Sequence, residues 1–381
     1  MRILFVTGYA LPHIGGVEVV VDGLAQALRE RGHEVVHVSS DAVRADDPPT
    51  SDGPDDVIRV AANNVLEDRL DVPYPLFGPA LVRVLNREVP RADVVNVHGF
   101  LYMGTIVALL RARTLRPPAR PVRILTEHVG HVEYTNPVLD RGEAAAIASL
   151  GRACARLSDG VVVLNEKVER EMRTLAVARP VVTIPNGLDT HAYRPPTHDE
   201  RGRLRAELGW DERPRVLFVG RLVAKKGIDV ALAAAARGGG EFELVVVGPG
   251  TLAAAPHTQN LGTLPRARVA CIYRAADAFV LPSRGEGFPV TAQEAMASGL
   301  PLVLSDDPAY RPLIAGAGAG VTLVPPEPAP VADALLALVR NPKARTAAAA
   351  EAAAHARNTF SWPRAAERYE RLFTELGARQ R

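Results

Sequence analysis

The chain of 381 residues carries 45 Lys and Arg against 43 Asp and Glu, which gives a net charge of +2. This length suits two domains of common size, and so balanced a charge argues against a protein whose main task is to coat nucleic acid. Its two cysteines, Cys154 and Cys271, are too few for a disulfide framework or a Cys-rich zinc site. No apolar run approaches the roughly 18 residues that span a bilayer, and the first run is too short for a signal peptide. We therefore expect a soluble, cytoplasmic protein.

The first half of the chain reads as alternating strands and helices. Residues 2–7 form a short apolar run rich in β-branched side chains, as expected of a strand buried in a parallel sheet. A loop with Gly15 and Gly16 leads into a helix at about 17–31, whose apolar residues form one stripe. Further strands are predicted at 33–40, 93–99, 122–128, 160–165 and 180–187.

The same order of elements restarts at residue 215, with a strand at 215–220, a helix near 228–237 and a strand at 243–248. Later elements are strands at 277–283, 301–306 and 320–324, an alanine-rich helix at 346–356 and a final helix at 360–377. Repeated strand–loop–helix–strand units imply parallel sheets with helices on both faces. The sequence therefore predicts an α/β protein of two doubly wound, Rossmann-like domains, joined within 185–196. Ligands of such sheets bind outside the carboxyl ends of the strands, so two facing domains would enclose a central cleft.

The segment at 284–299 has the most specific pattern. Gly285 and Gly287 allow a ligand to approach the backbone, and a helix that starts near Thr291 offers free N–H groups to a phosphate. Glu286 and Glu294 flank this turn, although carboxylates repel phosphate. They suit a ligand that also has vicinal hydroxyls, from which a carboxylate accepts hydrogen bonds. A nucleotide sugar has both groups, whereas the plain alternative is an exposed acidic loop before an ordinary helix.

A second pattern lies at 220–227, directly after the first strand of the second half. Arg221 and Lys226 could converge there on a diphosphate and replace the metal ion that many transferases use. The alternative is a solvated run of charges.

With these motifs the chain resembles the family 4 retaining glycosyltransferases, which have two Rossmann-like domains in the architecture called GT-B. The matching motifs are Gly15-Gly16-Val17-Glu18, Pro185-Asn186-Gly187, Gly220-Arg221 with Lys226, and Glu286 to Glu294. The resemblance covers essentially the full chain, and the Glu pair is its most specific part. It implies an acceptor-side domain at 1–190, a donor domain at 191–362, and a C-terminal helix at 363–381 that packs back on the first domain.

The resemblance assigns the donor site residue by residue. Glu286 would bind hydroxyls of the transferred sugar, and Glu294 would bind the ribose diol. Arg221 and Lys226 would bind the diphosphate and stabilise the charge of the leaving group. The remaining donor contacts are expected from the backbone of Gly16, Gly287, Phe288, Val290 and Thr291.

On the acceptor side, His128 at the end of a strand matches a histidine that the family places beside the transferred sugar. A histidine at a strand end is otherwise more often structural. His98 is a weaker acceptor-side candidate, with Asn96 and Glu127 after it. The remaining candidates, in a loop, are His131, Glu133 and Tyr134.

The resemblance also implies a mechanism without a metal ion or other cofactor. Because the configuration of the sugar is retained, attack comes on the face that the nucleotide leaves, and a phosphate oxygen of the donor takes the acceptor proton. Asp306-Asp307 is adjacent rather than spaced like a metal-binding Asp-x-Asp, and we expect a loop cap there. One departure is that only ten residues separate Gly250 from Leu261, where the family usually has a helix and a strand. This region and residues 261–265 would border the nucleotide base.

We therefore expect a retaining hexosyltransferase that uses a nucleoside-diphosphate sugar, UDP- or GDP-linked, and a hydroxyl acceptor that is a small molecule, lipid-linked or a polysaccharide. The alternatives are a nucleotide-sugar epimerase of GT-B shape and a non-catalytic nucleotide-binding protein. No nucleic-acid partner is expected. Peripheral membrane contact is possible through residues 78–88 and the arginines at 111, 113, 116, 120 and 123, with a core-packed helix as the alternative. The sequence does not identify the sugar, the base, the acceptor or the oligomeric state.

Overall fold

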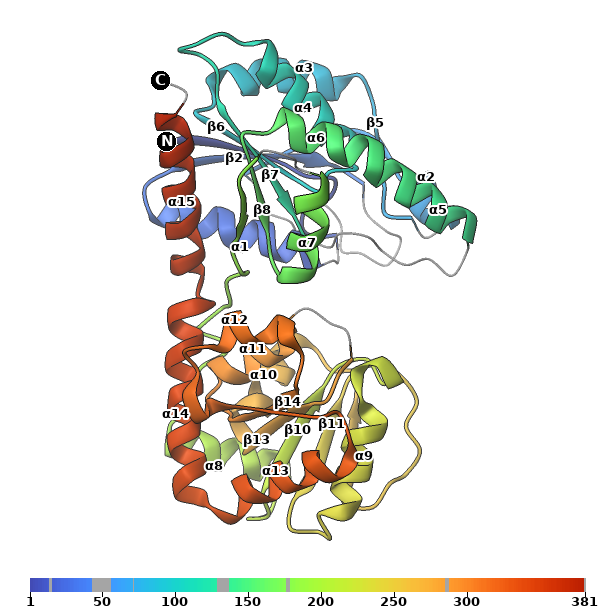
Figure 1. Cartoon of the computed structure of the whole chain (residues 1–381), viewed down its shortest axis with the longest axis vertical. Helices are drawn as coiled ribbons and strands as arrows, with labels where there is room; N and C mark the ends of the chain where they lie inside the picture. The colour runs from blue at the N-terminus through green and yellow to red at the C-terminus, as the bar shows by residue number, and fades with distance from the viewer. Residues whose placement is uncertain are drawn as a thin grey trace. The chain divides into compact units, whose positions relative to one another are not determined.

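The structure is a computed structural model that describes all residues except 14–15, 43–55, 71, 129–136, 176–178, 285–287 and 380–381. It divides into two compact units (Figure 1). Unit 1 comprises Met1–Gly187 and Trp362–Arg381, and unit 2 comprises Leu188–Ser361. The division at residue 187 lies inside the segment that the sequence marks as the joint.

Unit 1 contains a parallel sheet of seven strands in the order β3-β2-β1-β6-β7-β8-β9. Its strands are β1 (Arg2–Val6), β2 (Glu34–Ser40), β3 (Val57–Val60), β6 (Val94–His98), β7 (Val122–Glu127), β8 (Gly160–Val163) and β9 (Val181–Thr183). Strands β4 (Ala62–Asn63) and β5 (Leu76–Phe77) form a separate antiparallel pair, and both lie between β3 and β6 along the chain. The central strands are buried on both faces, which explains their continuous apolar runs.

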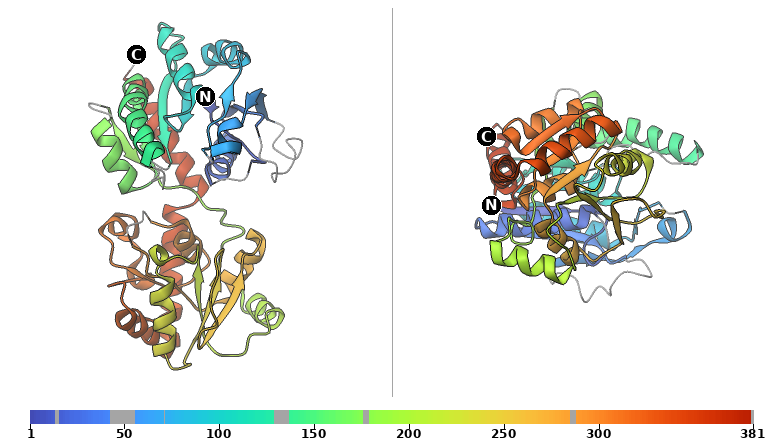
Figure 2. Two further views of the ribbon diagram at one scale, coloured as in Figure 1. Left: turned by 90° about the vertical axis from the view of Figure 1, so that its right-hand side faces the viewer. Right: turned by 90° about the horizontal axis from the view of Figure 1, so that it is seen from below.

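Helices cover both faces of this sheet. They are α1 (Gly16–Glu30), α2 (Val65–Leu70), α3 (Ala80–Glu88), α4 (Met103–Thr114), α5 (Pro137–Ala146), α6 (Arg152–Leu157), α7 (Glu166–Leu175) and α15 (Trp362–Ala378). One face packs against α1 and the C-terminal helix α15, which lie side by side (Figures 1 and 2). The other face packs against α3, α4, α6 and α7.

The C-terminal helix is fixed to unit 1 by its first residue, Trp362. A Cβ atom added to Gly23 would lie 2.4 Å from the indole ring, and one added to Gly187 would lie 2.3 Å from it. Only glycine therefore fits at either position without displacing Trp362. Trp362 thus packs the start of helix α15 against α1 and against Gly187, where the first segment of unit 1 ends.

Unit 2 contains a parallel sheet of six strands in the order β12-β11-β10-β13-β14-β15. Its strands are β10 (Arg215–Val219), β11 (Glu243–Val247), β12 (Thr258–Gly262), β13 (Ala278–Leu281), β14 (Leu302–Ser305) and β15 (Val321–Val324). Its helices are α8 (His198–Glu207), α9 (Ile228–Arg237), α10 (Arg266–Ala275), α11 (Val290–Ala297), α12 (Arg311–Ile314), α13 (Pro328–Arg340) and α14 (Pro342–Thr359). In this layer structure α9 packs beside α13, and α11 beside α14.

Both sheets have the same doubly wound topology, so the predicted fold class is confirmed. In each unit the first three strands extend to one side, and the chain then returns to the other side of the first strand. The direction of winding therefore changes between β1 and β6 in unit 1 and between β10 and β13 in unit 2. Ligands of such sheets bind at this switch point, outside the carboxyl ends of the strands.

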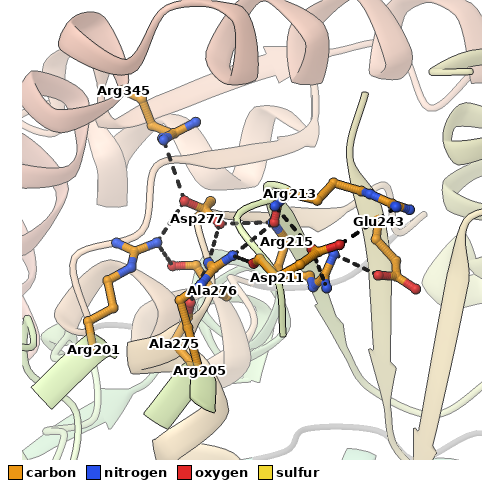
Figure 3. A network of polar contacts seen from close by, with 10 residues as sticks. All are labelled: Arg201, Arg205, Asp211, Arg213, Arg215, Glu243, Ala275, Ala276, Asp277 and Arg345. Atoms are coloured by element: carbon orange, nitrogen blue, oxygen red, sulfur yellow. Dashed lines mark hydrogen bonds and ion pairs between the residues drawn. The ribbon is translucent and has the colours of Figure 1, made fainter. Parts of the chain in front are cut away.

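A network of ion pairs holds the opposite, amino-terminal end of the second sheet (Figure 3). The carboxylate of Asp277, just before β13, accepts hydrogen bonds from the Arg201 and Arg205 guanidinium groups at 2.7 and 2.9 Å. It also accepts the backbone N–H of Arg215 at 2.8 Å, which links β13 to β10. Arg345 of α14 approaches the same carboxylate to 3.5 Å. This buried aspartate therefore joins two helices to the two central strands.

Two features differ from the sequence predictions, and a third agrees with one of the two alternatives given for residues 78–88. The short or polar strands β3, β4, β5 and β12 were not predicted. Strand β12 forms within the shortened region after Gly250 and pairs with β11, and no helix precedes it. Arg123 does not belong to a basic surface, because its guanidinium is buried and ion-paired with Asp159. Helix α3 buries Leu81, Leu85 and Glu88, as a core-packed helix does.

Candidate functional site

Three loops meet at the carboxyl ends of the central strands of unit 2. The loop after β10 is bonded on one side to the loop after β13, where the Arg284 N–H donates to the Lys225 carbonyl at 2.8 Å. On its other side the Leu222 N–H donates to the Pro249 carbonyl, after β11, at 2.9 Å. The segments predicted to bind the donor therefore lie side by side at the switch point of this sheet.

Glycines allow these loops to approach so closely. Gly227 has a φ of +75°, and a Cβ atom there would lie 2.1 Å from the Pro282 carbonyl oxygen. Gly248 has a φ of +144°, and its Cβ would lie 2.0 Å from the Gly220 carbonyl oxygen. Only glycine avoids both the steric clash and the unfavourable backbone conformation. The sequence pattern placed Gly220 and Gly227 in the loop but gave no reason for Gly248.

The loop after β10 carries both predicted phosphate ligands. Arg221 is exposed, whereas the aliphatic part of Lys226 packs beside Gly220, 3.8 Å from the position of an added Cβ. A short 3-10 helix at Ala224–Lys226 ends at Gly227, from which helix α9 starts. A guanidinium and an ammonium group on one loop are suitable donors to the oxygens of a diphosphate.

Helix α11 begins as predicted, at Val290, with an uncapped N-terminus. Pro289 precedes it, no side chain caps it, and the Pro289 carbonyl accepts the N–H groups of Ala292 and Gln293. Among the described residues, none accepts the N–H groups of Val290 and Thr291, which lie at the positive end of the helix dipole. Such an end binds anionic groups readily.

The ring of Phe288 anchors the start of this helix. It is buried, stacked on Phe360 at 5.5 Å between ring centroids and edge-on to Tyr310 at 5.6 Å. The ring of Phe288 is therefore used for packing, and the donor contact of its backbone N–H remains a prediction.

Glu294 lies one turn into α11 and is buried. Its Oε2 accepts a hydrogen bond from the Tyr273 hydroxyl at 3.1 Å, and its Oε1 lies 3.8 Å from the Arg266 guanidinium. Burial raises the pKa of Glu294, and Tyr193, Arg266 and Tyr273 oppose that rise. In turn, burial and the neighbouring carboxylate raise the pKa of Tyr193 to about 12. No motif in the sequence indicated these three partners, which come from α10 and the segment before α8.

Five site candidates lie outside the described residues. They are Glu286 and Gly287 in the loop after β13, and His131, Glu133 and Tyr134 after β7. Gly16 is the first residue of α1, and a Cβ atom there would meet no atom of the described residues within 4 Å.

In unit 1 the structure brings His98 and His128 together. His98 ends β6 and His128 follows β7, and the His98 Nδ1 lies 2.9 Å from the His128 Nε2. The two rings stack with centroids 5.2 Å apart. Burial lowers the pKa of His128 to about 4. Burial, His128 and His37 lower the pKa of His98 well below its ordinary value, so both rings are neutral at pH 7.

Glu127 holds the strand ends that carry this pair, and Asn96 is buried within the sheet. The Glu127 carboxylate accepts the backbone N–H groups of Phe100 and His128, both at 3.1 Å. Asn96 is fully buried, and its Oδ1 accepts the Thr126 hydroxyl at 2.8 Å. The placement of Asn96 at the acceptor surface was therefore wrong, because this residue lies inside β6, two positions before the strand ends.

A buried polar cluster after β1 was missed by the sequence analysis. His13 lies between Glu18 of α1, at 3.6 Å, and Glu67 of α2, at 3.4 Å, and stacks on Tyr9 at 4.1 Å between centroids. The Tyr9 hydroxyl donates to Asn64 at 2.6 Å. Glu18 had been recognised only as part of a motif. The other residues come from segments without a motif, which only the fold brings together.

An aromatic group lies next to this cluster at the switch point of unit 1. Cβ atoms added to Gly8 and Gly99 would lie 2.7 and 2.8 Å from the Tyr102 ring, so this ring fits between two strand ends. Tyr74 stacks on Tyr102 at 6.1 Å between centroids. The switch point of unit 1 is therefore lined by aromatic side chains.

The described residues show neither a metal-binding cluster nor a membrane-spanning helix. Within the described residues, no group of three or more His, Cys, Asp or Glu side chains is placed to hold a metal ion. Among the helices of the described parts, none combines the length and apolar character needed to cross a membrane.

Asp307 caps the turn that follows β14 by accepting the Ala309 N–H, as the loop-cap prediction states.

Comparisons with known proteins agree with this architecture. The family described as Glycosyl transferases group 1 matches residues 200–355, and the family described as Glycosyltransferase Family 4 matches residues 14–192. A GDP-mannose-dependent alpha-mannosyltransferase of Mycolicibacterium smegmatis is 31% identical over 333 residues, which cover 85% of this chain and 84% of the relative. A D-inositol 3-phosphate glycosyltransferase of Rhodococcus erythropolis is 30% identical over 385 residues, 93% of this chain and 85% of the relative.

Solved structures share the fold at lower identity. HepE of Anabaena, solved in complex with UDP, superposes with a TM-score of 0.71 at 18% identity, over 98% of this chain and 100% of HepE. Sucrose-phosphate synthase of Thermosynechococcus elongatus gives a TM-score of 0.69 at 20% identity, over 99% of both chains. The two Rossmann-like units, the sequence relatives and these neighbours agree: the chain is a glycosyltransferase of GT-B fold and belongs to glycosyltransferase family 4.

Proposed function

We propose that this glycosyltransferase moves a hexose-type sugar from a nucleoside-diphosphate sugar to an acceptor hydroxyl, with retention of configuration and without a metal ion. The observation that carries this proposal is the composition of the switch point in unit 2. An uncapped helix start, a loop with the cations Arg221, Lys225 and Lys226, and a buried carboxylate meet at one edge of the sheet. A nucleotide sugar offers groups complementary to all three, namely phosphates and a ribose diol.

In this proposal each group of the donor has a defined partner in unit 2. Arg221, Lys226 and the N–H groups that begin α11 bind the diphosphate. Glu294 accepts hydrogen bonds from the ribose hydroxyls; burial raises its pKa, and Tyr193, Arg266 and Tyr273 limit that rise because they favour the ionised form. Glu286, with the backbone of Gly287 and Phe288, holds the transferred sugar. The backbone of Gly16, the first residue of α1, is also proposed to contribute to phosphate binding.

The reaction needs no dedicated base in this scheme. The acceptor oxygen forms a bond to the anomeric carbon on the face from which the diphosphate leaves, and the bond between that carbon and the phosphate oxygen breaks. The acceptor proton passes to a donor phosphate oxygen. Arg221 and Lys226 neutralise the charge that develops on the nucleoside diphosphate, which is the task of a metal ion in other transferases. His128, neutral at pH 7, is proposed to act as a hydrogen-bonding group for the transferred sugar.

The donor is proposed to be UDP- or GDP-linked. A relative with 31% identity is named for GDP-mannose, and the neighbour HepE was solved with UDP-glucose. The residues expected to border the base differ from the usual pattern, because only strand β12 lies between Gly250 and Leu261. Both donors are therefore the first probes. The proposed acceptor is a hydroxyl of a small molecule, a lipid-linked sugar or a polysaccharide.

The proposal is tested by product analysis. The full chain is incubated with GDP-mannose or UDP-glucose and with D-inositol 3-phosphate, mannose oligosaccharides or glucan as acceptors, in the presence of EDTA. We expect release of GDP or UDP and formation of a glycosylated acceptor. The anomeric proton coupling of this product should show the same anomeric configuration as the donor sugar. Glu286→Ala should abolish transfer, whereas Glu207→Ala, at an exposed position of α8, should not change it. An inverted product, a reaction that requires a divalent metal, or full activity of Glu286→Ala would contradict the proposal.

A further inference from the structure

We propose that Tyr273 is a positioning residue of the donor site: its hydroxyl holds one oxygen of the Glu294 carboxylate, so that the other oxygen is presented to the ribose diol of the nucleotide. This inference rests on the proposed function, in which Glu294 binds the ribose, and it names the side chain that prepares Glu294 for that task. All the residues that carry the inference belong to unit 2.

The Tyr273 ring has a fixed place in the core of unit 2. It belongs to α10 and is fully buried. The Tyr193 ring meets it at 76° with centroids 5.7 Å apart, and the Phe279 ring of β13 lies at 6.1 Å with a tilt of 35°. Because the ring packs closely against two other aromatic rings, its hydroxyl is held in one position.

This hydroxyl lies within hydrogen-bond distance of two groups of α11. Its oxygen is 3.1 Å from Glu294 Oε2 and 3.1 Å from the Thr291 carbonyl oxygen. A tyrosine hydroxyl has a single proton, and an ionised carboxylate is a stronger acceptor than a carbonyl, so the proton then points to Oε2. When Glu294 is protonated, its carboxyl can donate to the Tyr273 oxygen, and the Tyr273 proton can turn to the Thr291 carbonyl. Tyr273 therefore holds the carboxyl group in the same place in both protonation states.

The second oxygen of the carboxylate has a different neighbour. Oε1 lies 3.8 Å from the Arg266 guanidinium, which is an ion pair beyond hydrogen-bond distance. The Arg266 side chain is 67% exposed. Oε1 therefore faces an exposed side chain, whereas Oε2 faces a fully buried one. We infer that Oε1 is the oxygen that accepts hydrogen bonds from the ribose hydroxyls.

The surroundings of Glu294 keep it fixed and ionised. Its carboxylate interacts with Tyr193, from the segment before α8, and with Arg266 and Tyr273, both of α10. All three side chains favour the ionised form, which accepts hydrogen bonds at both oxygens. A free glutamate side chain samples several rotamers, and ordering it on binding would reduce affinity. A carboxylate that Tyr273 already holds binds a diol without this cost.

A calorimetric comparison of two nucleotides tests the role of the hydroxyl. GDP and UDP are titrated into the full chain beside their 2′,3′-dideoxy analogues, which keep the base and the diphosphate, at a pH where Glu294 is ionised. We expect the wild type to bind the ribonucleotide about tenfold or more tightly than the dideoxy analogue. Tyr273→Phe, which keeps the buried ring, should reduce this ratio to about threefold or less and leave the affinity for the analogue unchanged. Equal weakening of both nucleotides, or an unchanged ratio, would overturn the inference.

Tyr369→Phe is the matched control. Tyr369 is also buried, in α15 of unit 1, where its hydroxyl lies 3.5 Å from the Thr126 hydroxyl. This variant loses a buried hydroxyl of the same kind outside unit 2, so both nucleotide affinities should stay unchanged. If Tyr273 acts through Glu294, adding Tyr273→Phe to Glu294→Ala should not lower the ratio further. A further loss in the double variant would show that Tyr273 acts independently of the carboxylate and would contradict the inference.

Carbon-13 NMR of the glutamate carboxyl groups gives a readout that needs no nucleotide. The Glu294 resonance is identified by its absence in Glu294→Gln. Because the Tyr273 hydroxyl favours the ionised form, Tyr273→Phe should raise the pKa of Glu294, whereas Tyr369→Phe should not change it. An unchanged pKa in Tyr273→Phe would contradict the hydrogen bond on which the inference depends.

These measurements separate the inference from the proposed function. If the wild type binds a ribonucleotide and its dideoxy analogue equally well, the ribose contact of the proposed function is wrong, and this inference is wrong with it. If the wild type prefers the ribonucleotide and Tyr273→Phe keeps the full preference, the ribose contact stands, and only the role of Tyr273 is wrong.

Discussion

Replacing Gly227 by alanine tests the convergence of the three loops in unit 2. The residue has a φ of +75°, and its added Cβ would lie 2.1 Å from the carbonyl oxygen of Pro282. Alanine in the left-handed conformation costs about 1–2 kcal/mol, and forcing the two backbones apart adds about 1–3 kcal/mol. We therefore expect a total destabilisation of about 2–5 kcal/mol for unit 2. Because the displaced loop carries Arg221 and Lys226, the affinity for nucleotides should also fall by about tenfold or more.

The control variant Gly209→Ala separates the conformational cost from the cost of forcing the two backbones apart. Gly209 has a similar φ of +67°, but a Cβ atom there would meet nothing within 4 Å. This control should therefore cost only the conformational penalty of about 1–2 kcal/mol and leave nucleotide binding unchanged. Stability is measured by amide hydrogen exchange of β10, because the two units need not unfold together. Nucleotide binding is measured by calorimetry. Equal effects of the two variants on both quantities would refute the described contact between the loops.

Three further predictions concern other parts of the structure. Asp277→Asn should destabilise unit 2 by about 3 kcal/mol in the same exchange assay, because it leaves the partly buried guanidinium groups of Arg201 and Arg205 without their carboxylate. Nucleotide affinity should weaken as the pH falls, because protonated Glu294 has lost a hydrogen-bond acceptor for the ribose. This loss should begin at a pH above the ordinary pKa of a glutamate, because burial raises the pKa of Glu294. Since Arg266 lowers that pKa, Arg266→Ala should move this loss to higher pH in calorimetric titrations, and an unchanged profile would contradict the assignment. Gly8→Ala, whose Cβ would lie 2.7 Å from the Tyr102 ring, should raise the acceptor KM without changing donor affinity.

The sequence predicts the buried parts of the sheets well for a physical reason. A strand that is covered on both faces needs a continuous apolar run, and such runs at 2–7, 93–99, 215–220 and 277–283 are strands in the structure. Strand β12, at the edge of its sheet, is half-buried and polar, so it has no such pattern. Edge strands are stabilised mainly by pairing with their neighbour, which a single sequence does not reveal.

The candidate site is predictable only where a motif marks it. The start of α11 and the loop after β10 follow from glycines, charges and their place after a strand. Partners such as Tyr273 and Arg266 come from a helix whose sequence has no distinguishing pattern, and they reach Glu294 only through the packing of α10. In the same way His98 and His128 were each expected at a strand end. Their contact depends on the order of the strands, because β6 and β7 are neighbours.

The central claim is that unit 2 binds a nucleoside diphosphate through protein cations instead of a metal ion. Calorimetric titration of GDP and of UDP into the full chain, with magnesium or with EDTA, tests it most directly. We expect one of the two nucleotides to bind at micromolar concentration with an affinity that magnesium does not change. Arg221→Ala should weaken binding by about tenfold or more, whereas Arg237→Ala, at an exposed position at the end of α9, should leave it unchanged. Binding that requires magnesium, or that is indifferent to Arg221, would contradict the claim, as would the absence of binding by either nucleotide.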